Sequence, residues 1–159
     1  MAANIHATCI RIGRAGQTLG APAGAGVLLL GKSGAGKSDL ALRLIARGAV
    51  LVSDDRTDLS VVRGNLIAAP PKQIAGLLEV RGVGLVKMPH APRVTVALVV
   101  ELTPKVTRMP EDRVFQPPTP LKLKPDACPH LISLNPFEVS ACDKVLAAAM
   151  AHLRQRLQR

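Results

Sequence analysis

Aromatic side chains are almost absent from this chain. Its 159 residues include two phenylalanines and neither tyrosine nor tryptophan. Proteins that bind single-stranded nucleic acid use aromatic rings as platforms on which successive bases stack, so the composition argues against that class of protein. The hydrophobic content of 48% comes mainly from Val, Leu, Ile and Ala and is enough for a sizeable core. The length predicts a single domain over residues 1–159.

Cysteines are few and long apolar runs are missing. Cys9, Cys128 and Cys142 are odd in number and widely spaced, so they form neither a disulfide framework nor a Cys-x-x-Cys metal pair. No apolar stretch approaches the ~20 residues that a membrane span needs. The N-terminus lacks the basic-then-apolar pattern of a secretory signal. We therefore expect a cytoplasmic protein with reduced thiols and no membrane span.

Acidic residues are outnumbered. The chain has 21 Lys and Arg against 11 Asp and Glu, which gives a formal net charge of +10. Such a balance favours anionic partners, including nucleotides, acidic proteins and nucleic acid. A solvated basic face explains it equally well. Charge alone thus leaves a basic nucleic-acid-binding module open, and we expect no specific nucleic-acid partner.

Against this background the chain carries a complete phosphate-binding loop, G-x-x-x-x-G-K-[ST]. It lies between residues 27–30, which read as a buried strand, and residues 39–46, which read as a helix. We expect its main-chain N–H groups, helped by the helix N-terminus, to surround phosphate. Lys37 can reach the β- and γ-phosphates of ATP, and the Ser38 hydroxyl can ligate Mg²⁺. The expected nucleotide-binding residues are Gly31, Lys32, Ser33, Gly34, Ala35, Gly36, Lys37 and Ser38. A chance glycine-rich turn is the less favoured interpretation.

A second apolar strand, residues 49–52, runs into an acidic pair. After Ser53 come Asp54 and Asp55. One carboxylate at the end of a strand can hold Mg²⁺, and the other can accept a hydroxyl proton or steer the attacking oxygen. A simple turn is the alternative, but the position of the pair one helix beyond the phosphate loop favours an active site.

Glu79 is a polar residue inside the otherwise apolar run 74–80, and Arg81 lies two positions further on. The pattern fits a surface salt bridge, which contributes little to stability. It fits equally a metal ligand beside an arginine that clamps phosphate. The residues alone leave both interpretations open.

The remaining elements predict an α/β fold: a mainly parallel or mixed sheet around the phosphate loop, flanked by helices. Residues 13–26 are rich in Gly, Ala and Pro and read as a long hairpin loop. A small hairpin turns at Arg63-Gly64. Residues 103–124 contain five prolines and are expected to be extended, with mobile parts. A final helix is expected over 138–157. The other expected strands cover 5–12, 58–62, 65–68, 94–102 and 131–134.

Three segments together carry a family resemblance. They are the phosphate loop, Leu51-Val52-x-Asp54-Asp55-Arg56, and Leu78-Glu79-Val80-Arg81-Gly82-Val83-Gly84. The set resembles the catalytic C-terminal domain of bacterial HPr kinase/phosphorylase, whose signature is similar to the third segment. That family has an HPr kinase/PEP-carboxykinase-like fold. It uses ATP and Mg²⁺ to phosphorylate a seryl hydroxyl on the phosphocarrier protein HPr. Many members also reverse this reaction by phosphorolysis, and the family forms hexamers, so a homo-oligomer is implied.

The resemblance also implies roles by position. Lys37 would bind phosphates, while Ser38, Glu79 and Asp55 would serve Mg²⁺. The pair of Asp54 and Asp55 would supply the proton acceptor and metal support, without deciding which carboxylate is the base. Arg81 belongs to the signature that serves both activities. Arg108 matches a family arginine that reaches the transferred phosphate, and His6-Ala7 stands where the family has His-Gly on its first strand.

Two departures qualify these expectations. The chain starts at the catalytic domain, which resembles the short form found in alphaproteobacteria. The long form's P-G-R-N segment, tied to dephosphorylation, has no clear match between Lys124 and Ser140. The preferred function is therefore a protein serine kinase acting on an HPr-type carrier, with weak phosphorolysis at most. The alternative is a small-molecule kinase on the same scaffold. The lack of aromatic side chains that could stack on a base argues against this alternative.

Overall fold

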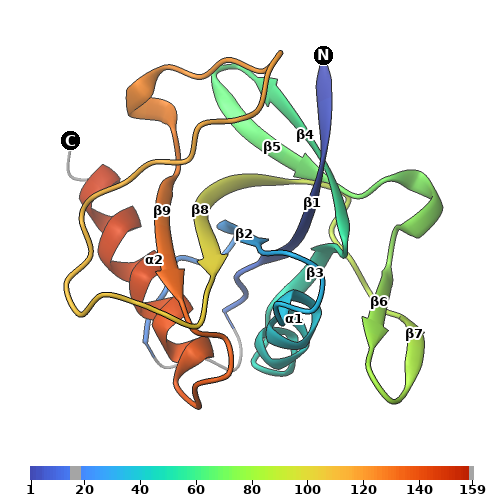
Figure 1. Ribbon diagram of the computed structural model, residues 1–159. Coiled ribbons are helices and arrows are strands. Elements are labelled where there is room, and N and C mark those ends of the chain that lie inside the picture. Colours follow the sequence, from blue (N-terminus) through green and yellow to red (C-terminus); the bar gives the residue numbers. More distant parts are fainter. Residues whose placement is uncertain (15–18, 158–159) are drawn as a thin grey trace.

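The computed structural model describes residues 1–14 and 19–157 (Figure 1). Its seven-stranded sheet folds back on itself, so it is best seen as two sheets that share strands. The larger sheet has the order β3-β1-β2-β8-β9, and the smaller sheet is formed by β4, β5 and parts of β1 and β8. The strands are β1 (Ala2–Arg11), β2 (Gly26–Leu30), β3 (Val50–Ser53), β4 (Arg56–Val62), β5 (Asn65–Ala69), β8 (Val94–Leu102) and β9 (His130–Leu134).

Strand β1 connects the two sheets. Its first half, residues 2–6, pairs with β4, whereas residues 7–11 pair with β2. Strands β1 and β2 are antiparallel and consecutive in the chain, so they form the hairpin predicted around residues 13–26. The β4–β5 hairpin turns at Arg63 and Gly64, as predicted, and both residues have positive φ angles of 50° and 77°.

The direction of the strands decides where a site can form. Strands β2, β8 and β9 are parallel, and β1 runs antiparallel to both β2 and β3. Strand β3 therefore runs in the same direction as β2. The larger sheet is mainly parallel and the whole is mixed, in agreement with the predicted fold class. The carboxyl ends of β3, β2, β8 and β9 meet at one edge, where ligands bind in open α/β sheets.

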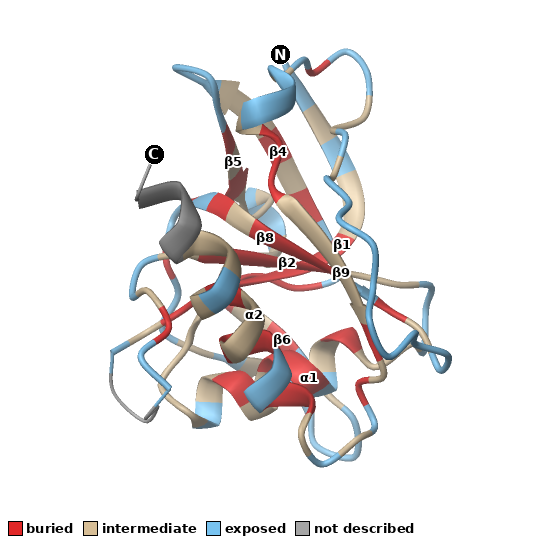
Figure 2. Ribbon diagram, turned by 90° about the vertical axis from the view of Figure 1, so that its left-hand side faces the viewer, coloured by how far each residue is buried: buried red, intermediate tan, exposed pale blue. Residues whose placement is uncertain are grey.

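Helices α1 (Lys37–Ala46) and α2 (Ala141–Leu157) cover one face of the larger sheet (Figures 1 and 2). One apolar core lies between this face and the helices and includes Leu40 and Leu44 of α1. A second core lies on the other face, under the smaller sheet, and includes Leu121. Figure 2 shows buried residues gathered in β2, β8 and the sheet-facing side of α1.

Helix α2 begins three residues later than predicted. Residues 135–140 form turns, in which the main-chain N–H of Glu138 donates to Asn135 and that of Ala141 donates to Glu138. The first helical bond runs from Lys144 to Ser140, over 2.8 Å. The prediction of a helix from Glu138 is thus wrong because local turn bonds use the main-chain groups that a helix would need.

Residues 103–124 contain no strand or helix, as predicted, but only part of the segment is exposed throughout. Its second half is attached to β9: Leu131 donates to the carbonyl of Arg113 over 2.9 Å, and Phe115 donates to that of Pro129 over 2.8 Å. Leu121 is buried. Residues 104–112 are exposed throughout. The prediction of a mobile segment is therefore restricted to 104–112.

A small separate hairpin carries the signature segment. Strands β6 (Leu77–Val80) and β7 (Gly84–Lys87) pair only with each other, after the short 3₁₀ helix η1 (Lys72–Ile74). Leu78 is fully buried in the same core as α1, which fixes the hairpin against that helix. A second 3₁₀ helix, η2 (Pro125–Ala127), precedes β9. No helix in the described ranges is both long enough and apolar enough to cross a membrane.

Candidate active site

The phosphate loop lies at the carboxyl edge of β2 and leads into α1. Gly34 and Gly36 have φ angles of 80° and 98°, in the left-handed region that favours glycine. A Cβ atom at Gly31 would lie 2.8 Å from the Cβ of Ala35. The tight curl is therefore possible only with the glycines that the motif places here. The N-terminus of α1 faces the loop, where main-chain N–H groups and the helix dipole favour an anion.

Lys37 is 6% exposed and folds back over the loop. Its ammonium donates to the carbonyls of Gly31, over 2.5 Å, and Lys32, over 3.0 Å. Burial lowers the pKa of Lys37, and the nearby carboxylates of Asp55 and Asp54 partly oppose this shift. The charge of Lys37 thus lies within electrostatic reach of the acidic pair.

Asp54 is the central buried polar residue of the site, with 5% of its surface exposed. Its Oδ1 accepts hydrogen bonds from the Ser38 hydroxyl over 2.6 Å and from the Thr8 hydroxyl over 2.9 Å. Its Oδ2 accepts the main-chain N–H of Glu79 over 3.0 Å. This one carboxylate therefore ties together the phosphate loop, β1 and the β6–β7 hairpin.

The sequence interpretation missed Thr8. The sequence does contain an indication of its role, because Thr8 is the polar residue within the buried run Ala7–Ile10 of β1. A buried hydroxyl needs a hydrogen-bond partner, which here is the carboxylate of Asp54. The partner lies on another strand, so the sequence does not identify it.

Asp55 points the other way, with 66% of its side chain exposed. Its φ angle of 65° is unusual for a residue other than glycine and turns the chain sharply after β3. Oδ1 of Asp55 lies 2.8 Å from Nε2 of His6, and its main-chain N–H donates to Thr8 over 3.3 Å. The structure thus separates the two acidic residues into one buried and one solvent-facing carboxylate.

Glu79 lies in β6, opposite Leu85 of β7, and Arg81 lies in the turn of this hairpin; both are exposed. Within residues 1–14 and 19–157, no ion pair joins them. The salt-bridge interpretation therefore has no support in the structure. The main-chain N–H of Glu79 donates to Asp54, so this residue of β6 lies beside the acidic pair.

Arg108 lies in the exposed segment 104–112, and among the described residues it forms no hydrogen bond or ion pair with the phosphate loop. The structure thus brings together the phosphate loop, the acidic pair, His6 and Glu79, but not Arg108.

The residues present fit a magnesium ion. No cluster of three His, Cys, Asp or Glu side chains that could hold a metal occurs in the described part of the chain. Mg²⁺, however, commonly takes only one or two carboxylates and completes its shell with water and substrate phosphates. The Ser38 hydroxyl and the buried Asp54 carboxylate, 2.6 Å apart beside the phosphate loop, are such a donor set.

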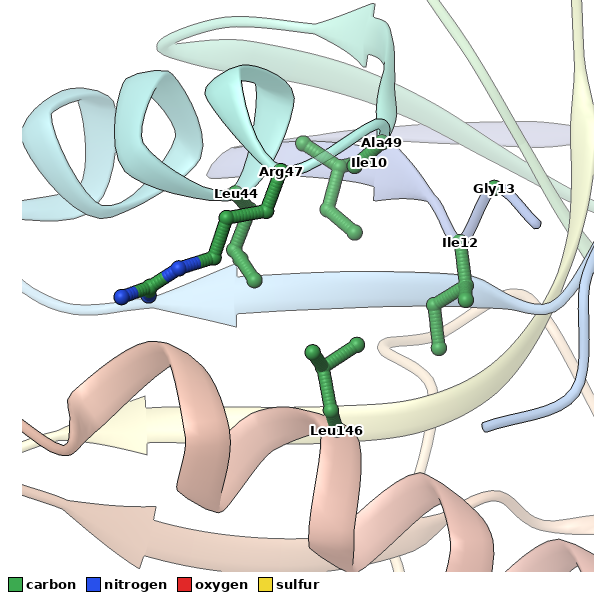
Figure 3. Close-up of a pocket in the computed structure, with 7 residues that line it drawn as sticks. All are labelled: Ile10, Ile12, Gly13, Leu44, Arg47, Ala49 and Leu146. Atoms are coloured by element: carbon green, nitrogen blue, oxygen red, sulfur yellow. The ribbon is translucent and has the colours of Figure 1, made fainter. Parts of the chain in front are cut away.

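A small enclosed cavity lies elsewhere (Figure 3). It measures about 10 Å³ and is bordered mainly by apolar side chains, among them Ile10, Leu44 and Leu146, and also by Arg47. Strand β1 runs antiparallel to β2, so the cavity's residues Ile12 and Gly13 lie at the sheet edge opposite the phosphate loop. The space is about that of one water molecule and is unrelated to the phosphate-loop site.

The fold and site define a mixed α/β protein in which a loop with the G-x-x-x-x-G-K-[ST] motif faces a buried aspartate. The model of the HPr Serine kinase C-terminal domain family matches residues 17–114, more than half of the chain, and the chain belongs to that family. The match includes the phosphate loop, the acidic pair and the signature hairpin. It confirms the expected family.

Similar proteins agree with this assignment. The HPr kinase/phosphorylase of Clostridium tetani is 48% identical over 66 residues, which are 42% of this chain and 22% of that protein. That of Clostridium beijerinckii is 51% identical over 63 residues, or 40% and 21%. These matches thus span about a fifth of the relatives' length. The structure of the Hpr(Ser) kinase/phosphatase from Coxiella burnetii has a TM-score of 0.72 over 99% of both chains at 22% identity, which confirms the fold.

Proposed function

We propose that this chain is an ATP- and Mg²⁺-dependent protein serine kinase that phosphorylates an HPr-type phosphocarrier. The observation that carries the proposal is the bonding of Asp54, which joins Ser38 of the phosphate loop to Glu79 of the signature hairpin. A phosphate site, a metal-binding carboxylate and the family signature therefore belong to one site. Membership of the HPr serine kinase family supports the choice of substrate class.

In this proposal the loop binds the phosphates of ATP, and Lys37 exchanges its two carbonyl contacts for phosphate oxygens. Ser38 and Asp54 would hold Mg²⁺, with Glu79 beside them; the ion neutralises phosphate charge when bound. This assigns the metal to Asp54 rather than to Asp55, the carboxylate expected from the sequence. The reason is that Asp54, and not Asp55, contacts the Ser38 hydroxyl.

Asp55 is then the base. Its exposed carboxylate can accept the proton of the carrier's seryl hydroxyl while the seryl oxygen attacks the γ-phosphorus. The bond from that phosphorus to the β–γ bridging oxygen breaks, and ADP leaves. His6 orients Asp55 through the 2.8 Å contact. Arg81 on the hairpin and Arg108, after closure of 104–112, would stabilise the charge of the transferred phosphoryl group.

The test is incubation with γ-labelled ATP, Mg²⁺ and purified HPr-type carriers, beside a panel of small-molecule acceptors. We expect label on one carrier and none on the same carrier with its acceptor serine replaced by alanine. Transfer to a small acceptor alone would make the chain a small-molecule kinase. Salt-sensitive duplex binding without any transfer would favour the nucleic-acid alternative. Light scattering in the same preparation measures the homo-oligomer, a hexamer by resemblance.

We also propose that phosphorolysis is weak. In that direction Asp55 must donate the proton while inorganic phosphate is held for attack, and the long form's segment for this step is not matched. The assay contains serine-phosphorylated carrier, inorganic phosphate and Mg²⁺ without nucleotide, and it measures pyrophosphate. Release as fast as the forward reaction would contradict this part of the proposal.

A further inference from the structure

One of the two phenylalanines lies against the phosphate loop. Phe137 is 70% exposed, although a large apolar side chain is normally buried. A Cβ atom at Gly36 would lie 3.4 Å from Cε1 and Cζ of the Phe137 ring and 3.2 Å from Cγ of Pro136. The edge of the ring therefore touches the loop, while much of its surface stays open to solvent.

The ring is carried by a segment with fixed ends. The guanidinium of Arg43, on α1, donates to the carbonyl of Pro136. The main-chain N–H of Phe137 donates to the side chain of Asn135 over 3.0 Å. Glu138 pairs with Lys144 on α2. The main chain that carries the exposed ring is thus anchored to both helices, which limits the backbone entropy lost when a ligand binds the ring.

Phe137 and the acidic pair lie on opposite sides of the phosphate loop. In the sheet order β3-β1-β2-β8-β9, Asp54 follows β3 and the segment that carries Phe137 follows β9. The loop follows β2, between them. A nucleotide whose γ-phosphate faces the acidic pair therefore extends its base away from that pair, toward the side where Phe137 lies.

We propose that Phe137, with Pro136 beside it, is the platform on which the nucleobase of ATP stacks. Aromatic rings bind bases through their π faces, and every base presents such a face. The chain needs only one such ring, which explains how a protein nearly free of aromatics can hold a base. The proposal rests on the proposed ATP-dependent function and names a subsite of that site.

The experiment compares ligands that share the phosphates and differ in the base. Calorimetry in Mg²⁺ measures the affinities of ATP and of inorganic tripolyphosphate for the parent and for Phe137→Ala. We expect the variant to bind ATP about 5- to 30-fold more weakly than the parent. This loss lies in the lower part of the range measured for base stacking, because one face of the ring is open to solvent. Tripolyphosphate affinity should stay within about twofold, since Lys37 and the loop are unchanged.

Two matched variants serve as controls. Phe137→Trp should keep or improve ATP affinity, because it retains a face for stacking. Val139→Ala removes a side chain of the same segment that is 93% exposed, and it should change neither affinity. Phe137 is exposed, so thermal unfolding of Phe137→Ala should match that of the parent.

The other outcomes overturn the proposal. An equal loss of affinity for ATP and tripolyphosphate would show that the ring only supports the shape of the loop. Unchanged affinity for both ligands, with weaker binding of the carrier protein, would make Phe137 part of a docking surface instead. A parent protein that binds neither ligand would contradict the proposed function and this inference together, whereas the first two outcomes leave the proposed function intact.

Discussion

The two sides of the phosphate loop are built differently. The acidic side consists of His6, Thr8, Asp54, Asp55 and Glu79, and hydrogen bonds of 2.6–3.3 Å connect these residues to one another or to Ser38. The open side consists of residues 104–112 and 135–139. There the first segment is exposed throughout, and Phe137 and Val139 present apolar surface to solvent.

This difference indicates a division of labour. Phosphoryl transfer depends on groups that are in position before the reaction, because reorganising them would raise the barrier. Binding of a base and of a protein partner can instead use surfaces that the ligands cover and order. We therefore expect chemistry to fail when the acidic side is changed, and ligand affinity or dynamics to change when Phe137 or residues 104–112 are changed.

Removal of the proposed base, Asp55, is the largest expected effect. Asp55→Asn keeps the size of the side chain but cannot accept a proton, so we expect kcat to fall by about 10²- to 10⁴-fold with little change in ATP affinity. The matched variant Asp54→Asn should mainly raise the Mg²⁺ concentration needed for half-maximal rate. Steady-state kinetics over a Mg²⁺ series measures both. If saturating Mg²⁺ restores Asp55→Asn and not Asp54→Asn, the two roles are reversed.

Lys37→Ala tests the loop itself. Loss of a charge-assisted bond to phosphate in the transition state costs about 2–4 kcal/mol, or roughly 30- to 1000-fold in rate. Circular dichroism should stay unchanged, because the loop glycines and α1 remain. Lys32→Ala is the control, since Lys32 contributes to the loop through its main chain; it should retain most activity. A Lys37→Ala protein that is folded and fully active would contradict the assignment of the phosphate site.

Glu79→Gln tests the edge of the acidic side. A hard cation prefers a charged oxygen to an amide, so the Mg²⁺ requirement should rise on the order of tenfold, and more than the ATP requirement does. The hydrogen bond to Asp54 comes from the main chain of Glu79 and survives the change. An unaltered Mg²⁺ titration would show that the carboxylate has no part in metal binding.

Hydrogen exchange contrasts the two sides directly. The amides of β1 and β3 are already bonded in the sheet and should exchange slowly with or without ATP. Residues 104–112 should exchange fast in the free protein and become protected when ATP and Mg²⁺ are added, if Arg108 closes over the phosphate. Slow exchange of this segment without nucleotide would rule out a closing flap.

The smallest expected effect concerns pH and stability. Burial lowers the pKa of Lys37 below its ordinary value of 10.5, so between the lowered value and 10.5 the folded state binds fewer protons than the unfolded state. Stability of the parent relative to Lys37→Met should therefore rise with pH through that window, and the full cost of burying the charge should be present below it. Denaturant melts across the alkaline range measure the difference. If the stability difference between the parent and Lys37→Met stays constant or falls as the pH rises, the burial of the Lys37 ammonium is contradicted.

Much of the local structure could be predicted from sequence. The strand over Val94–Leu102 and the turn at Arg63-Gly64 match the structure, because apolar runs and turn residues act over a few positions. The predicted start of α2 was wrong, because turn hydrogen bonds between residues three apart compete with the first helical hydrogen bonds. The sharing of β1 between two sheets was not predictable, because it depends on pairing with β4 and β2, far along the chain.

The sequence by itself determined the phosphate loop, the acidic pair and the family, since each depends on residue types at short spacing. Only the tertiary structure decided that Asp54 is buried and Asp55 exposed, that Thr8 donates to Asp54, and that the edge of the Phe137 ring lies beside Gly36. The bond between Thr8 and Asp54 spans 46 positions, and that between Arg43 and Pro136 spans 93. Contacts between residues so far apart in the sequence form only when strands pair and helices pack, so they cannot be predicted from the local sequence.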